Sequence, residues 1–190
     1  MFSETAGEPF VSRQNPFRET HTMSHPSLPD ELPADFGAAL ASLGAAERIG
    51  VEEMKLLVLL EMAGEPLYEK MAALALDDEA RLLLLKNGRE ETAHAHRLAK
   101  AIEILTGEAF EIPPLSLNPY ASAPPPAELS AGVLAGLVEG EKRGGEDYQR
   151  MADAEPNPEV AELLRQNGRE ENIHGERVQK VIEILGANPN

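Results

Sequence analysis

Two short stretches of this sequence place a glutamate and a histidine three residues apart. They are Glu91 with His94 and Glu171 with His174, and each pair follows the same Asn-Gly-Arg-Glu segment. A step of three residues on an α-helix is a rotation of roughly 300°, so each pair would share one helix face. A carboxylate and an imidazole on one face can bind a metal ion, although a single Glu-x-x-His pair is weak evidence.

The two pairs belong to a longer repeat with an offset of eighty residues. Residues 61–105 align with residues 141–185 without a gap, and about twenty of the forty-five positions are identical. The alignment matches Glu61 with Glu141 and Tyr68 with Tyr148. We interpret this self-similarity as an internal duplication.

The repeat adds a third candidate ligand to each Glu-x-x-His pair. Glu61 and Glu141 lie thirty residues before Glu91 and Glu171, each inside an apolar stripe of the preceding predicted helix. Four ionised carboxylates buried without partners would each cost many kcal/mol. Two divalent metal ions would balance them, with both imidazoles neutral. The predicted metal ligands are therefore Glu61, Glu91, His94, Glu141, Glu171 and His174, and this set suits Fe, Mn or Zn without choosing among them.

The hydrophobic pattern predicts an all-α fold. A short helix is expected at 36–43, and four long helices at about 45–74, 79–105, 128–154 and 158–185. The Pro-rich stretch 108–127 is long for a loop and can cross the length of a helix. We predict a flexible tail over residues 1–33 and a four-helix bundle over 34–190, with hairpins at 45–107 and 128–186 joined by this crossover.

The amino-acid composition excludes several classes of partner and of metal site. The formal charge of −16 argues against nucleic acid or an anionic membrane as a partner. The absence of cysteine excludes a disulfide framework, a thiolate metal site and a rubredoxin-type iron centre. We find no secretory signal and no apolar run long enough to span a bilayer, so we expect a cytoplasmic protein.

With these motifs in place, the chain resembles the ferritin-like superfamily, which includes bacterioferritins and rubrerythrins. Its Arg-Glu-Glu-x-x-His segments, with the upstream glutamate and a tyrosine seven residues after it, are most similar to encapsulated ferritins, here as a hairpin in tandem. The resemblance implies a ferritin-like bundle with two iron ions. It also implies bridging roles for Glu91 and Glu171, terminal roles for Glu61 and Glu141, and one histidine on each metal.

Other residues near the motifs have two readings each. Tyr68 and Tyr148 are candidate catalytic residues, either as donors that hold carboxylates of the opposite hairpin or as electron relays, but each could be an ordinary core tyrosine. Glu65, one turn after Glu61, is either an additional ligand or a solvent-facing side chain. Three basic residues, Arg89, Arg97 and Lys100, are expected to make ion pairs on the helix surface rather than bind a substrate, and the same holds for their repeat mates Arg169, Arg177 and Lys180.

Two functions follow from the predicted site. The first is oxidation of Fe(II) by O₂ or H₂O₂, as a ferroxidase or peroxidase in iron handling or oxidative-stress defence. The second is a non-redox role, in which Zn or Mn ties the hairpins together or supports partner binding. A third reading, a bundle with merely superficial acidic residues, conflicts with the apolar neighbours of all six ligands. Exposed apolar helix faces could support a homodimer.

Overall fold

The computed structural model describes residues 28–46 and 48–187, and their regular structure is entirely helical. The α-helices are α1 (Phe36–Ala45), α2 (Val51–Ala72), α3 (Asp78–Thr106), α4 (Ala131–Ala154) and α5 (Pro158–Ala187), with a short 3-10 helix, η1 (Leu115–Leu117). The described residues contain no strand, so the all-α prediction is confirmed. None of these helices is both long and apolar enough for a membrane span. Most of the predicted tail, residues 1–27, lies outside the described part.

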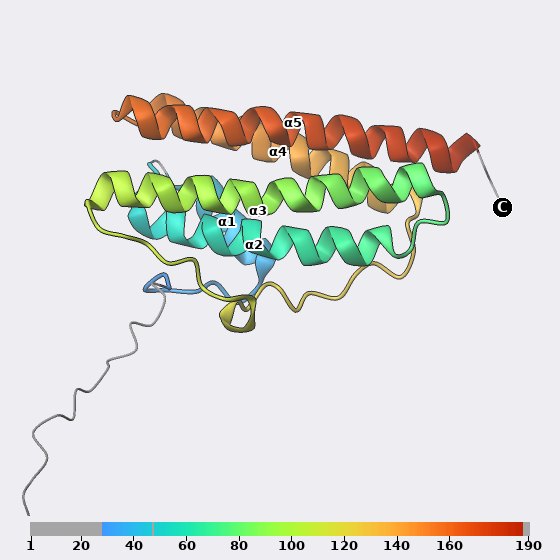
Figure 1. The fold of residues 1–190 in the computed structure, drawn as a ribbon, viewed down its shortest axis with the longest axis horizontal. Helices are drawn as coiled ribbons and strands as arrows, with labels where there is room; N and C mark the ends of the chain where they lie inside the picture. Colours follow the sequence, from blue (N-terminus) through green and yellow to red (C-terminus); the bar gives the residue numbers. More distant parts are fainter. Residues whose placement is uncertain (1–27, 47, 188–190) are drawn as a thin grey trace, which may run out of the picture.

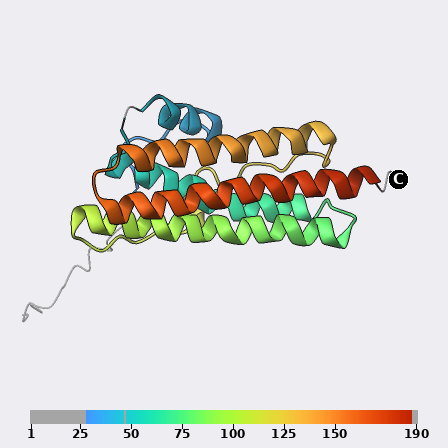
Figure 2. The same cartoon turned by 90° about the horizontal axis from the view of Figure 1, so that it is seen from above.

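The four long helices form a bundle of two antiparallel hairpins, α2–α3 and α4–α5. The crossover leaves the end of α3 and runs the length of the bundle before α4 begins (Figure 1). The two hairpins meet mainly through α3 and α5. The short helix α1 lies on the outside, beside α4 in the second view (Figure 2). This arrangement is the predicted bundle with one long connection.

Helix caps explain where two of the elements begin. The sequence pattern predicts a helix from residue 45, but α2 begins at Val51 because Gly50 is its N-cap residue. The Glu53 carboxylate reaches back and accepts a hydrogen bond of 2.8 Å from the Gly50 amide. Ser130 caps α4 and accepts from the backbone of the first turn, so this helix begins at residue 131 rather than 128.

The apolar core is divided into two clusters, one toward each end of the bundle. One cluster gathers around Met54, Leu98 and Leu164, and the other around Leu84 and Val178. The six predicted ligands belong to neither cluster, and on α3, α4 and α5 they lie between the residues of the two clusters. The bundle therefore holds a polar layer in the middle of an otherwise apolar interior.

The crossover is anchored to the bundle by hydrogen bonds. Asn118 is buried and donates from Nδ2 to the Leu59 carbonyl of α2 at 2.7 Å, and its Oδ1 accepts from the Tyr120 amide at 3.0 Å. The Tyr120 hydroxyl donates to the Pro33 carbonyl at 3.0 Å, and its ring packs edge-on against Phe36 of α1. These contacts tie the crossover, α1 and the segment before it to the same face of α2.

We predict that Asn118→Ala lowers the free energy of unfolding by about 1–3 kcal/mol, because two buried hydrogen bonds are lost and the Leu59 carbonyl loses one donor. Urea denaturation of the full chain measures this change. Ser116→Ala, an exposed position in the same crossover, is the matched control and should change stability little. Equal effects of the two substitutions would contradict the anchoring role of Asn118.

Candidate metal centre

The structure brings all six predicted ligands together in the middle of the bundle. Each is buried, with at most 7% of its surface exposed. Their ligand atoms form two groups, within each of which the atoms lie within 4.8 Å of one another. The first group holds Glu61, Glu91, His94 and Glu171, and the second holds Glu91, Glu141, Glu171 and His174. Glu91 and Glu171 are therefore common to both groups, and each remaining ligand belongs to one.

The two histidine rings stack on each other and turn the same nitrogen toward the carboxylates. Their centroids are 5.2 Å apart and their planes differ by 15°. The Nδ1 atom of His94 lies 3.1 Å from Glu171 and 3.3 Å from Glu61. The Nδ1 atom of His174 lies 3.1 Å from Glu91 and 3.6 Å from Glu141. Each group thus has one imidazole nitrogen facing its carboxylate oxygens.

The opposite nitrogen of each ring fixes the tautomer. Nε2 of His94 lies 3.2 Å from Glu170, and Nε2 of His174 lies 3.1 Å from Glu90. A carboxylate only accepts hydrogen bonds, so Nε2 carries a proton, and a ring that gives up its second proton has its lone pair on Nδ1, toward the predicted ligands.

The surroundings of this Nδ1 lone pair test whether a metal ion fits between the histidines and the glutamates. Nδ1 of His174 is buried and has no hydrogen-bond partner among the described residues. An imidazole lone pair facing carboxylate oxygens is unfavourable unless a cation lies between them. Carboxylate and imidazole donors in this arrangement suit divalent Fe, Mn or Zn. The donor set and its geometry therefore fit metal ions.

The two tyrosines each contact the glutamate of the opposite hairpin. The Tyr68 hydroxyl of α2 donates to Glu141 of α4, and the Tyr148 hydroxyl of α4 donates to Glu61 of α2. Burial raises the pKa of both tyrosines well above the usual value, and the neighbouring carboxylates raise it further. Both hydroxyls therefore remain protonated donors at neutral pH.

A second set of cross-hairpin contacts lies behind the histidines, and the sequence analysis missed it. Arg97 pairs with Glu170, and Arg177 pairs with Glu90 at 2.5 Å. Both arginines are largely buried, with 17% and 14% of their side chains exposed. The prediction of surface ion pairs for Arg97 and Arg177 is therefore wrong, because each arginine reaches into the interface between the hairpins.

Two buried asparagines complete this set. Asn87 donates to the Tyr68 hydroxyl and to the His174 carbonyl, both at 3.2 Å, and accepts from Arg177 at 3.1 Å. Asn167 donates to the His94 carbonyl at 3.3 Å and accepts from the other arginine. The repetition of Asn, Arg and a doubled Glu in both halves was the signal that could have revealed these residues.

The carboxylates differ in pKa according to their partners. Burial raises the pKa of Glu91 well above its usual range, and the negative charges of Glu171, Glu61 and Glu141 add to this rise. Burial also raises the pKa of Glu171. Burial acts in the same direction on Glu61 and Glu141, but the adjacent rings of His94 and His174 and the hydroxyl groups of Tyr148 and Tyr68 outweigh it and hold their pKa below the usual value.

Burial acts to lower the pKa of His94, but its hydrogen bonds with Glu171 and Glu61 outweigh this and raise the pKa to about 10. Without a metal, protons on His94 and on the carboxyl groups with a raised pKa therefore reduce the negative charge of the site. Metal ions bring positive charge to the same atoms, so protons and metal ions compete for this site.

Glycines permit the close approach of the helices at the site. A Cβ atom on Gly64 would lie 2.6 Å from the Glu91 side chain, and one on Gly88 would lie 2.9 Å from the Tyr68 Cβ. The repeat mate of Gly64 is different, because a Cβ on Gly144 would meet Glu171 at an ordinary 3.5 Å. The packing around the two shared glutamates is therefore tighter in the first hairpin than in the second.

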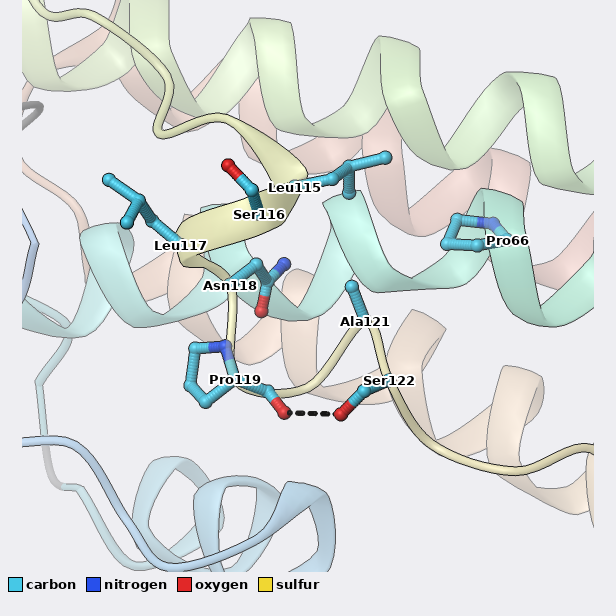
Figure 3. A pocket seen from close by; sticks show the side chains of 8 residues that line it. All are labelled: Pro66, Leu115, Ser116, Leu117, Asn118, Pro119, Ala121 and Ser122. Atoms are coloured by element: carbon cyan, nitrogen blue, oxygen red, sulfur yellow. Dashed lines mark hydrogen bonds between the residues drawn. The ribbon is translucent and has the colours of Figure 1, made fainter.

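Other polar residues and hollows lie apart from the cluster. Glu65 accepts a hydrogen bond of 2.6 Å from Thr92 and belongs to neither ligand group. A hollow of about 580 Å³ lies where the crossover passes Pro66, lined by η1 and the residues after it (Figure 3). Its lining contains no acidic, basic or histidine side chain, so we assign it no part in the metal chemistry.

Comparison with known proteins agrees with this architecture. Residues 58–182, more than half of the chain and including all six ligands, match the family model described as Rubrerythrin. Searches of curated proteins and of solved structures found no match. The family match confirms the predicted rubrerythrin-type, ferritin-like identity, whereas the particular similarity to encapsulated ferritins stays a prediction. The chain belongs to the rubrerythrin family.

Proposed function

We propose that this protein binds two iron ions in the centre of its bundle and oxidises Fe(II) with O₂ or H₂O₂. The observation that carries the proposal is the pair of overlapping ligand groups, each with one histidine and three glutamates. Two divalent ions supply four positive charges, which equal the charge of four ionised glutamates. Family membership supports a metal-binding role of the same kind.

The geometry suggests a role for each ligand. Glu91 and Glu171 would bridge the two ions, because each contributes atoms to both groups. Glu61 and His94 would complete one position, and Glu141 and His174 the other. The tyrosines would hold the two terminal glutamates in place through their hydroxyl donors.

Iron supplies the redox chemistry, because each Fe(II) ion can give up one electron. Two Fe(II) ions held by these residues would supply the two electrons that, with two protons, reduce one H₂O₂ to two water molecules. The protein's part is to bind the ions at a fixed separation, to keep the imidazoles in the ligating tautomer and to limit the access of water. We propose that the glutamates behind the histidines, Glu90 and Glu170, maintain that tautomer.

Metal content with stoichiometry tests this function. We expect two irons per chain after loading with Fe(II) under nitrogen, and loss of both in a Glu91→Ala/Glu171→Ala double variant. Addition of H₂O₂ or air should then oxidise the bound iron, followed by its optical absorption.

Binding of one zinc per chain that iron does not displace would instead support the non-redox alternative. Two bound irons that stay reduced in air and H₂O₂ would contradict the oxidase proposal but not the metal site. A protein that binds no metal under any of these conditions would contradict both.

We predict that Gly64→Ala weakens metal binding by about 1–3 kcal/mol, because the added methyl group overlaps the Glu91 side chain. Gly144→Ala is the matched control, since its methyl group makes only an ordinary contact with Glu171. Titration of both variants with Co(II), followed by absorbance, compares their affinities. Equal affinities would show that Glu91 does not need the space beside Gly64.

We predict that Glu170→Ala lowers metal affinity about 10–100-fold, because His94 loses the acceptor that orients its ring. Glu162→Ala removes an exposed ion pair with Arg169 on the same helix and serves as the control. The same Co(II) titration measures both variants, and circular dichroism checks that each is folded. Unchanged affinity in Glu170→Ala would contradict the positioning role.

A further inference from the structure

A cavity of about 220 Å³ leads from the protein surface to the candidate metal centre. It lies between α2 and α4, and α1 covers part of its outer side. Its inner end is formed by the glutamate ligands and the two tyrosines. Its walls are made chiefly of large apolar side chains from three helices, which include Leu43, Leu57, Leu60, Leu67, Leu137 and Met151.

The cavity exists because the helix pairs of the bundle are not packed equally closely. α3 and α5 pack closely against each other, whereas α2 and α4 approach each other far less. Gly140 and Gly144 of α4 line the cavity, and neither places a side chain in it. Leu40 of α1 is 51% exposed and lines the outer part, so the cavity reaches solvent.

The polar groups of the cavity already have partners. The hydroxyls of Tyr68 and Tyr148 at the inner end donate to Glu141 and Glu61. Asp147 of the lining forms an ion pair of 2.9 Å with Arg150. A water molecule needs two to four polar partners, and apart from Asp147 only the carboxylates and hydroxyls at the inner end of the cavity offer any, so the part between the apolar walls is unfavourable for water.

We propose that this cavity binds a small, uncharged apolar molecule beside the metal centre. A dry apolar cavity of about 150 Å³ is enough to bind benzene, so this cavity has room for a substituted aromatic ring or a short aliphatic chain. Burial of the ligand's apolar surface drives binding. The occupant lies against the carboxylates on the α2–α4 side, and it therefore controls the access of other small molecules to the metals.

The inference rests on the walls of the cavity, and only its consequence for metal access rests on the proposed function. Toluene is a suitable probe, and the full chain as purified is the sample. We expect saturable toluene-induced shifts in the ¹³C-methyl NMR signals of Leu57, Leu137 and Met151. The methyl signals of Leu76 and Leu82, which are exposed far from the cavity, serve as internal controls.

A cavity-filling variant makes the test specific. A Cβ on Gly140 would meet nothing within 4 Å, so Gly140→Leu places a side chain at the cavity lining without a backbone clash. It should weaken toluene binding at least tenfold. Gly136→Leu, one turn earlier on α4 and outside the lining, also meets nothing within 4 Å and should bind toluene as the wild type does.

Several results would overturn the inference. They are the absence of saturable shifts, equal shifts at Leu76 and Leu82, and unchanged toluene binding in Gly140→Leu. Metal content measured on the same samples separates the two proposals. Two metals per chain without toluene binding would contradict only this inference, whereas toluene binding in a chain that takes up no metal would contradict only the proposed function.

Discussion

The burial of four carboxylates in one small volume is the constraint on which the rest of this structure depends. Burial and mutual repulsion raise the pKa of Glu91 and Glu171, and a positive charge must compensate wherever these groups ionise. The histidine rings and the tyrosine hydroxyls contact these carboxylates directly, and the two arginines pair with the glutamates behind the histidines. The apolar clusters on both sides keep water away and make each of these interactions stronger than it would be at the surface.

Each predicted ligand has a partner in the other hairpin. Tyr68 of the first hairpin holds Glu141 of the second, and Glu170 of the second hairpin orients His94 of the first. The mirrored contacts of Tyr148 and Glu90 complete the arrangement. A single hairpin therefore carries half of the ligands without the groups that position them. The site therefore becomes organised only when the two hairpins dock.

The clustering of the six candidate ligands could be predicted from the sequence because helical spacing alone places Glu and His on one face, and because Glu61 and Glu141 interrupt apolar stripes. Glu90 and Glu170 could not be recognised in this way. Their role depends on the histidine and arginine of the docked partner hairpin, which lie more than seventy residues away in the sequence. The start of α2 depends on a cap at Gly50, and the cavity depends on the unequal spacing of helix pairs. Both are tertiary or local details that periodicity does not encode.

The unequal clearance beside Gly64 and Gly144 has a consequence for how the two groups of candidate ligands can differ. In an assembly of identical chains, a substitution near one metal is copied at every equivalent position. Here the two halves are encoded separately, so the packing around one half of the site can become tighter while the packing around the other becomes looser. The repeat-related positions Glu65 and Gly145 already differ between the halves. If the proposed site holds two ions, the two halves can therefore evolve different affinities, so that one ion stays bound while the other exchanges.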